Sequence, residues 1–471
     1  MKILLVSSES YSSSLSPLAR SIGYIAAAYR KLGACVVGFS PFFSKFEPES
    51  NYKEEGKFRE KLRDFEYSVL KRTDQCPTNT AGKDLFIKFE DYFGRDGIYG
   101  DNREKSYSDN HFRFSFFASA AMNYCIETGF KPDAVHVHEW SGIAGALAKT
   151  VYKDYFQNVP VTLTIHNIRY DFHCSSRYIT KMGLPAEGFN IDGYEFWDKI
   201  SMLKAAILYS DKVAFTSASY LNHILATDSP GGIRGFLESQ SRKLLGVQNG
   251  VDYSVWGIEN DVEAFKQQKK DALRRELGLA IDSSMLVYSH LESNFDTSAQ
   301  IISTILANLL NMNLQLVIGL SEEDPNYQFF TTIQEKNSSK IALLPLTENE
   351  EVLHHRLAAA DIFFSINAED PSLSLLLQAS AAGSLPLSSR SANKSFEFLK
   401  PFERQKEEDN ANAFVAADVS PDFILGQFRI AESVFCENKS LWSKLVNNAS
   451  SLRVPWELTA EKYFSTFTPK S

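Results

Sequence analysis

Short apolar runs, many of them rich in β-branched residues, alternate with longer amphipathic stretches along most of the chain. In the first half, the apolar runs predict buried strands at residues 1–7, 35–39, 134–138, 161–166, 212–216 and 243–248. The stretches between them predict helices at residues 23–32, 115–128, 142–155 and 200–209. Because strands and helices alternate, we expect a parallel sheet with helices on both faces.

The same pattern restarts in the second half. Strands are predicted at residues 285–289, 314–318, 341–344, 361–365 and 385–388, and helices at residues 297–310, around 358 and at 373–382. Two successive parallel sheets predict an α/β chain with two Rossmann-like domains facing a cleft. In such domains ligands bind at the carboxyl ends of the strands.

Three charged stretches interrupt this alternation. Residues 44–63 and 71–83 carry many charges and few apolar side chains, so they are predicted to form a low-order insertion after the second strand. Residues 403–412 have the same character and are predicted to form a surface loop. The boundary between the two domains is expected near residues 247–256.

Length and charge narrow the classes of function. A chain of 471 residues exceeds one ordinary core, which agrees with two domains. A net charge of −9 gives no basic footprint, so nucleic acid and anionic membranes are not expected as partners. An anionic ligand would have to be held by local cations or by backbone amides.

The cysteines and the apolar runs bear on the compartment. The five cysteines are scattered and show no metal-ligand spacing, which favours reduced thiols in a cytosolic protein. The first apolar run spans only residues 3–6, too short for a secretory core, and no segment approaches the ~18 apolar residues of a membrane span. We therefore expect a soluble, cytoplasmic protein that does not enter a membrane.

Ten segments, taken in order, carry a resemblance to a known family. They are residues 1–9 (MKILLVSSE), 133–140 (DAVHVHEW), 161–170 (VTLTIHNIRY), 183–206 (GLPAEGFNIDGYEFWDKISMLKAA), 229–237 (SPGGIRGFL), 247–256 (VQNGVDYSVW), 274–279 (RRELGL), 353–361 (LHHRLAAAD), 378–386 (QASAAGSLP) and 455–464 (PWELTAEKYF). Together they resemble the glycogen/starch synthase family of GT-B glycosyltransferases. The resemblance implies an acceptor-side domain at 1–246, a nucleotide-sugar-side domain at 247–452, and a crossover helix at 453–471 that returns to the first domain.

The resemblance also implies a reaction. The family transfers glucose, usually from ADP-glucose, to the end of an α-1,4-glucan with retention of configuration, and it uses neither a metal nor another cofactor. The leaving diphosphate must then be neutralised by fixed Arg and Lys side chains and by backbone amides at a glycine-rich turn. An α-glucan and ADP-glucose or ADP are thus the implied partners.

Several family positions are kept. His166 matches the family histidine near the transferred glucose, so it is predicted to be catalytic, with Asn167 beside it. His138 opens a His-Glu-Trp turn where the family has His-Asp-Trp. Lys204 and Asn249 match two further positions and are predicted to bind the donor or the substrate.

The acidic motif of the family falls on Ala368-Glu369-Asp370-Pro371. Alignment from Gly383 places Asp370 at the catalytic carboxylate, and a shift of one residue places Glu369 there. A carboxylate is present in either alignment, so both residues are catalytic candidates.

The donor-facing cations and glycines depart from the family pattern. In the first glycine loop the family has Lys-x-Gly-Gly, whereas this chain has Arg20-Ser21-Ile22-Gly23, and β-branched Ile22 opposes a close approach of the backbone. In the second cationic element His290 replaces Arg, Phe295 replaces Lys and Asp296 replaces Gly. Arg20, Gly23 and His290 nevertheless remain the donor-site candidates.

Structural interpretations stand beside these functional ones. His138 and Trp140 would also cap a strand and fill a wall of the site, and Gly250 and Asp252 would serve in a turn. His354 and His355 are adjacent on a helix and point in different directions, which favours packing over metal binding.

Two hypotheses follow. In the first, the chain is a glycogen synthase-like pseudoenzyme that binds an α-glucan or a protein partner. In the second, it is an active retaining glucosyltransferase that uses ADP-glucose with rebuilt contacts, and other cations such as Arg20, Lys204, Arg234 or Arg390 converge on the diphosphate. We favour the first, because the losses are confined to the donor-facing motifs while the scaffold is kept.

Overall fold

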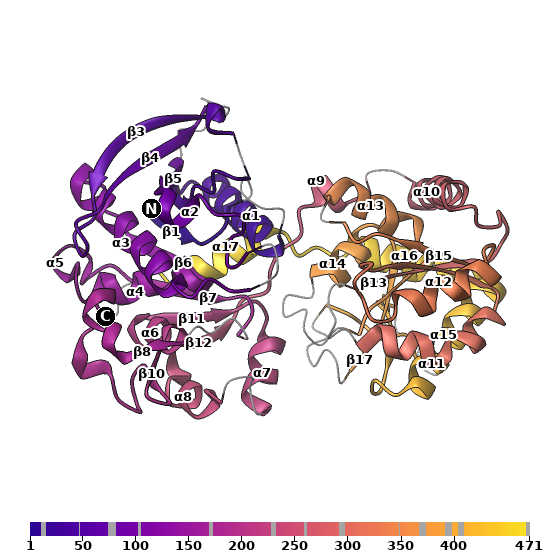
Figure 1. Cartoon of the computed structure of the whole chain (residues 1–471). Helices are drawn as coiled ribbons and strands as arrows, with labels where there is room; N and C mark the ends of the chain where they lie inside the picture. The colour runs from indigo at the N-terminus through magenta and orange to yellow at the C-terminus, as the bar shows by residue number, and fades with distance from the viewer. Residues whose placement is uncertain are drawn as a thin grey trace. The chain divides into compact units, whose positions relative to one another are not determined.

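The protein was analysed as a computed structural model (Figure 1). It describes residues 1–10, 16–46, 48–73, 82–101, 105–168, 173–227, 232–258, 261–291, 297–347, 349–366, 374–390, 398–403 and 409–467. The chain divides into two compact units, the first formed by Met1–Gln248 with Trp456–Ser471 and the second by Asn249–Pro455.

Unit 1 is built on a nine-stranded sheet. In spatial order its strands are β12 (Leu244–Gly246), β11 (Lys212–Phe215), β7 (Val161–Ile165), β6 (Ala134–His138), β1 (Lys2–Ser7), β2 (Cys35–Pro41), β5 (Gly82–Lys88), β4 (Glu66–Arg72) and β3 (Tyr52–Arg59). The strands from β12 to β5 pair in parallel, whereas β4 and β3 are antiparallel at the edge.

Both faces of this sheet are covered by helices. The helices of unit 1 are α1 (Pro17–Lys31), α2 (Glu90–Phe93), α3 (Asn110–Thr128), α4 (Ile143–Lys149), α5 (Lys153–Phe156), α6 (Met202–Tyr209), α7 (Ala218–Ala226), α8 (Arg234–Ser239) and α17 (Trp456–Phe464). Leu4 and Val6 share a core with α3, α4 and α6, while Ile3 and Leu5 pack with α1 and α17 on the other face. A strand covered on both faces is apolar throughout, which explains the continuous apolar runs.

The closing helix α17 belongs to unit 1, although the chain reaches it after unit 2. Tyr463 and Trp456 lie in one buried cluster with Tyr29 of α1, and the Trp456 and Tyr24 rings stack with centroids 5.8 Å apart. In Figure 1 the yellow α17 lies among the indigo and violet elements of the first half of the chain.

The predicted low-order insertion at residues 44–63 and 71–83 is wrong at residues 52–59, 71–72 and 82–83, which form strands, while residues 47 and 74–81 of it lie outside the described residues. Tyr52–Arg59 and Glu66–Arg72 form the long β3–β4 hairpin visible in Figure 1, and β5 pairs with β2. On β3 only Tyr52 is buried, and the charged side chains face solvent. An edge strand of this kind has the composition of a disordered segment, because charges protect its free edge from pairing.

Several other boundaries differ from the prediction, among them the start of α3 at Asn110, five residues early. Helix α1 begins at Pro17, six residues early, because the Ser16 Oγ accepts the Ala19 N–H and proline fits the first turn. The helix predicted at 142–155 is divided into α4 and α5. Residues 200–201, predicted as the start of a helix, belong to strand β10 (Lys199–Ser201). This strand lies in a small antiparallel sheet with β8 (His173–Ser175) and β9 (Glu195–Phe196).

Unit 2 is built on a six-stranded, wholly parallel sheet. Its strand order is β15 (Ile341–Leu344), β14 (Leu314–Gly319), β13 (Met285–His290), β16 (Ile362–Phe364), β17 (Leu385–Ser389) and β18 (Phe414–Ala416). Its helices are α9 (Tyr253–Trp256), α10 (Val262–Leu277), α11 (Thr297–Leu310), α12 (Tyr327–Lys336), α13 (Glu350–Ala359), α14 (Ser374–Ala381), α15 (Pro421–Glu437) and α16 (Lys439–Ser450). Alternate β13 residues enter two separate cores, one on each face.

Two further observations concern the compartment. The four cysteines that the structure describes, Cys35, Cys125, Cys174 and Cys436, are free thiols. No helix within the described ranges is both long and apolar enough to cross a membrane.

Candidate functional site

The candidate site of unit 1 lies at the carboxyl ends of three neighbouring strands. β7, β6 and β1 are adjacent in the sheet, and His166, Glu139 and Ser8 directly follow them. Because the strands are parallel, these residues emerge at the same edge of the sheet, where ligands bind in this type of fold. His138, the last residue of β6, pairs in register with Thr164 of β7 and with Ser7 of β1.

Two of the predicted site histidines contact each other here. His138 Nδ1 lies 3.0 Å from His166 Nε2, so one ring donates to the other. Burial lowers the pKa of His166 to about 4, and burial with the neighbouring His136 and His166 holds the pKa of His138 well below its ordinary value. Both rings are therefore neutral at pH 7. They can exchange hydrogen bonds with hydroxyl groups, but they supply no positive charge.

A buried polar chain continues from this pair into unit 1. The His136 ring lies tilted against the His138 ring with centroids 4.2 Å apart, and its two nitrogens contact Tyr29 Oη at 3.0 Å and Thr164 Oγ1 at 2.8 Å. The Thr164 hydroxyl donates to the Tyr463 Oη of α17 at 2.9 Å. Burial and His166 lower the pKa of His136 to about 3. The closing helix thus fixes the residues beneath the site.

Glu139 holds the loop that carries His166. Its φ of +48° is uncommon for a residue other than glycine. One carboxyl oxygen accepts the His166 N–H and also the Asn167 N–H, the latter at 2.7 Å. Burial, with a smaller contribution from Glu9, outweighs the two donors and raises the pKa of Glu139 to about 8. Glu139 is therefore a positioning group that is largely protonated at pH 7.

An aromatic wall lies beside these groups. The Tyr99 hydroxyl donates to Glu9 Oε1 at 2.8 Å, and the Tyr99 ring stacks on Trp140 with centroids 5.3 Å apart. The sequence interpretation assigned no role to Glu9 or Tyr99. Glu9 lies in the first segment of the resemblance, two residues after the end of a strand, which was a usable signal. Tyr99 lies in a loop with no comparable pattern.

The predicted Arg20 and Gly23 lie within helix α1 rather than in a loop. The helix starts at Pro17, so neither residue stands at a turn that could cradle a phosphate. Gly23 lines a cavity of about 350 Å³ between α1 and the sheet, whose walls are apolar at Ile22 and Phe39 and charged at Arg30, Arg72 and Asp84. This cavity is not a phosphate site of the expected kind.

Lys204, another predicted donor-site residue, lies in α6 and is 4% exposed. Its ammonium group donates to the main-chain oxygens of Ile191 at 3.1 Å and Glu195 at 2.6 Å. The Phe236 ring lies 4.8 Å from the same nitrogen. These contacts tie the β9 segment to α6, and they occupy the positive charge.

The remaining predicted residues belong to unit 2. His290, at the end of β13, is 4% exposed, and its Nδ1 lies 2.8 Å from the Tyr288 hydroxyl. Asn249 is buried at the start of the unit. Glu369, Asp370, Phe295 and Asp296 lie outside the described residues.

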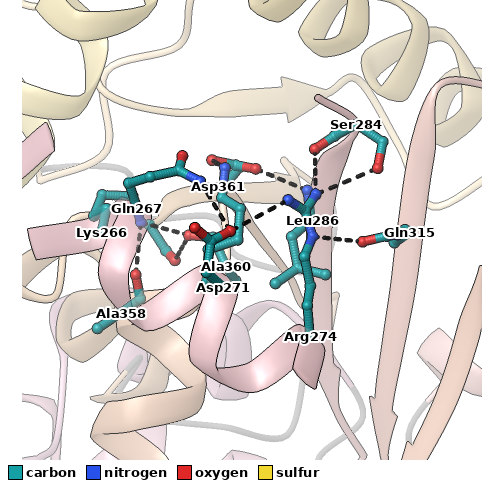
Figure 2. A network of polar contacts seen from close by, with 12 residues as sticks. Lys266, Gln267, Asp271, Arg274, Ser284, Leu286, Gln315, Ala358, Ala360 and Asp361 are labelled. Atoms are coloured by element: carbon teal, nitrogen blue, oxygen red, sulfur yellow. Dashed lines mark hydrogen bonds and ion pairs between the residues drawn. The ribbon is translucent and has the colours of Figure 1, made fainter. Parts of the chain in front are cut away.

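Unit 2 contains buried cations, but they are held in an internal network (Figure 2). Lys270 donates to Asp361 Oδ1 at 2.6 Å, and Asp361 Oδ2 accepts the Leu286 N–H at 2.7 Å. Lys266 donates to the oxygens of Ala358 and Ala360 at the end of α13, at 3.1 and 2.5 Å. Burial lowers the pKa of Lys266 to about 7.

Arg274 completes this network. The side chain is 1% exposed, and its guanidinium donates at 2.8 Å to Gln315 Oε1 and to the main-chain oxygens of Asp282 and Ser284. The network fastens α10 to β13, β14 and β16. It explains why α10 carries three cations that do not face solvent.

The other cations proposed as substitutes are also engaged. Arg234 pairs with Glu238 at 2.9 Å, and Arg390 lies 3.8 Å from Glu403. His354, offered as a packing residue, contacts the Trp256 and Phe265 rings with centroids 6.0 and 6.2 Å apart. Within the described part of the chain, no group of three or more His, Cys, Asp or Glu residues is placed to hold a metal ion.

Comparison with known proteins adds to these observations. The family model described as "Starch synthase catalytic domain" matches residues 2–239. Curated relatives include proteins named glycogen synthase from Treponema denticola, 27% identical with 99% of this chain and 98% of the relative covered, and from Geotalea uraniireducens, 27% identical with 98% and 97% covered.

Solved structures resemble the chain over nearly its whole length. The catalytic domain of starch synthase IV from Arabidopsis thaliana, bound to ADP and acarbose, has a TM-score of 0.86 and 20% identity, with 99% of this chain and 98% of that chain covered. A sucrose-phosphate synthase from Thermosynechococcus elongatus has a TM-score of 0.58. These likenesses confirm the predicted GT-B type of fold.

Proposed function

Because the chain belongs to the starch synthase catalytic domain family, we propose that it is a glycogen synthase-like protein of α-glucan metabolism with an impaired donor site. In this proposal it binds an α-glucan or a protein partner and transfers glucose poorly or not at all. Its free cysteines and the absence of a membrane-crossing helix among the described residues support a cytoplasmic location.

The observation that carries the proposal is which residues stand at and just after the carboxyl end of β13. At the family positions for Arg and Lys the chain has His290 and Phe295, and His290 is buried against Tyr288. A leaving diphosphate needs charge-assisted hydrogen bonds from fixed cations. Removing one preorganised donor costs about 3–4 kcal/mol in the transition state, and such losses do not add simply. Losing both cations implies a fall in turnover of at least about a thousandfold.

The candidate replacement cations support the same view. Lys204 donates to two main-chain oxygens, and Arg234 and Arg390 face carboxylates. Releasing Lys204 would leave those buried oxygens without their donor, which costs about 1–3 kcal/mol for each unsatisfied group. Arg20 lies within α1, away from any glycine turn in the described residues. Lys204 is therefore a poor substitute for the missing pair.

The acceptor side supports retained binding of a sugar. His138, His166 and Glu139 are held together by hydrogen bonds at the strand ends, and the two histidines are neutral. Neutral imidazoles suit sugar hydroxyl groups, which both donate and accept. The flanking Trp140 and Tyr99 supply aromatic surface.

A second candidate function is transfer of glucose from ADP-glucose to an α-1,4-glucan end. The same His138–His166 pair favours it, together with the carboxylates Glu369 and Asp370 in the sequence. This function requires a cation on the diphosphate that the described residues do not supply.

Isothermal titration separates the two functions. The purified chain would be titrated with ADP, ADP-glucose and maltoheptaose in parallel. The proposal predicts heat of binding for maltoheptaose and none for either nucleotide. Micromolar ADP-glucose binding would contradict it and favour the transferase. If none of the three ligands gives heat of binding, only the version of the proposal in which the chain binds a protein partner remains.

A further inference from the structure

A small hairpin in unit 1 ends in an unusual turn. Strands β9 and β10 pair antiparallel, with Lys199 opposite Phe196, and Trp197 and Asp198 form the two-residue turn between them. Both turn residues have positive φ, +50° and +61°. Two-residue turns of this kind favour Asn and Gly, because a left-handed conformation costs other residues about 1–2 kcal/mol each. A tryptophan here departs from the local preference.

The tryptophan is also the most exposed large apolar side chain of the described residues. Its exposed fraction is 82%, whereas Trp256, Trp442 and Trp456 are all below 10%. Phe196 meets the indole edge-on, with ring centroids 6.3 Å apart and planes at 84°, and Phe196 in turn stacks on His173 at 5.0 Å. One edge of the indole is thus supported while the ring itself faces solvent.

Hydrogen bonds hold the β9–β10 hairpin that carries the Trp197 ring. The Asp198 N–H donates to Glu195 Oε1 at 2.7 Å within the turn. The buried Lys204 ammonium holds the oxygens of Glu195 and Ile191, which flank the hairpin. The lysine that sequence comparison suggested for the donor site therefore acts here as the anchor of the hairpin. A ring fixed before binding loses little conformational entropy when a ligand stacks on it.

The surroundings select the kind of ligand. Ile191, 79% exposed, is the other exposed apolar side chain in this segment, and Asp192, Asp198 and Lys199 are charged. A stable protein interface needs about 800 Å² from each partner, and a tryptophan supplies at most about 250 Å². One ring among charged groups matches a pyranose, which has an apolar C–H face and polar edges.

We propose that Trp197 is a stacking platform for a glucose unit of an α-1,4-glucan, forming a binding subsite on the β9–β10 hairpin. This inference rests on the glucan binding in the proposed function. It adds a place and a residue for that binding outside the strand-end site. Aromatic stacking contributes up to about 1.5 kcal/mol beyond area burial, which corresponds to about a tenfold change in affinity.

The test compares maltoheptaose affinity by calorimetry in the full-length wild type, Trp197→Asn and Trp197→Phe. Asparagine suits positive φ, so W197N removes the ring without straining the turn, and its free energy of unfolding should equal or exceed that of the wild type. We expect W197N to bind about tenfold more weakly and W197F to stay within about threefold. The matched control is Phe423→Ala, which removes a ring 52% exposed on α15 and should leave affinity unchanged.

Each other outcome overturns the inference in a distinguishable way. Equal maltoheptaose affinity in wild type and W197N would overturn it and leave the proposed function in place. If the wild type binds no maltoheptaose, glucan binding is excluded both from this inference and from the proposed function. Equal weakening in W197N and F423A would show nonspecific stacking. A W197N variant with unchanged affinity but a smaller sedimentation coefficient would assign the ring to a contact between copies.

Discussion

Units 1 and 2 are both parallel sheets covered by helices on two faces, and they differ in what stands at the ends of their central strands. In unit 1, His138, His166 and Glu139 form a connected hydrogen-bonded group. In unit 2, the end of β13 carries His290, buried against Tyr288, where the family resemblance calls for a cation. Among the described residues, unit 1 therefore has hydrogen-bonding groups suited to a sugar at its strand ends, whereas unit 2 has a buried histidine at the end of β13.

The difference is not a general loss of charge from unit 2. Lys266, Lys270 and Arg274 remain buried and fully engaged with Asp361, Gln315 and main-chain oxygens (Figure 2). These cations stabilise the sheet rather than face a ligand. The described buried cations of unit 2 thus hold α10 against the sheet.

The largest expected effect concerns the internal network of unit 2. Asp361→Ala leaves the Lys270 ammonium buried without its partner and removes the acceptor of the Leu286 N–H. Breaking one side of a buried ion pair costs about 3–5 kcal/mol. Denaturant unfolding should show this loss. The exposed Arg234–Glu238 pair is the control, and Arg234→Ala should cost less than about 0.5 kcal/mol. Equal effects would show that the network is not structural.

The next largest effect is expected when the family's cations are introduced at positions 290 and 295. The triple variant His290→Arg, Phe295→Lys, Asp296→Gly brings back the family's cations and glycine. Two charge-assisted contacts of about 1.5 kcal/mol each would tighten ADP binding about a hundredfold. The matched control, H290Q with F295Q and D296G, has no added charge and should stay near the wild type. If both triples bind ADP equally, charge at this position does not limit donor binding.

A smaller effect follows from the raised pKa of Glu139, about 8 in the fold against an ordinary 4.5. When the pKa of a carboxyl group is higher in the fold than in the unfolded chain, its protonated form stabilises the fold. This contribution is fully present below the unfolded pKa and is lost as the pH rises through the folded pKa of about 8. Between pH 6 and 9 the wild type should lose about 2.5 kcal/mol more than Glu139→Gln. Parallel pH profiles of the two proteins would show Glu139 to be ionised in the fold.

The smallest effect comes from His136, whose pKa is lowered to about 3 from 6.5. A depressed histidine stabilises the fold above pH 6.5, and this contribution declines as pH falls toward 3. Between pH 7.5 and 5 the wild type should lose about 2 kcal/mol more than His136→Gln. The pH slope separates this effect from the constant cost of losing the contacts to Tyr29 and Thr164. An identical slope in both proteins would place an accessible, titrating ring at this position.

Much of the fold could be predicted, because the sheets are buried on both faces. The apolar runs of β6 and β15 mark those strands to the residue, and α11 has the predicted bounds. The β3–β4 hairpin could not be recognised in this way, since its charged side chains face solvent and only its pairing identifies it as a strand. The start of α1 was predictable in principle from Ser16-Pro17.

The candidate site was partly predictable for a similar reason. Residues that follow adjacent parallel strands meet at one edge, which is why His138 and His166 could be placed together. Where a long side chain ends depends on tertiary packing, so the two main-chain acceptors of Lys204 could not be foreseen. His136 was within reach, because residues two apart on a strand share a face with each other.

The most direct measurement is ADP release from ADP-glucose in the presence of maltoheptaose, with the wild type compared with His166→Ala. An impaired donor site predicts that both proteins release ADP at rates close to background, because the wild type has little or no turnover for the substitution to remove. Release by the wild type that is lost in H166A would contradict the account and establish the chain as an active glucosyltransferase.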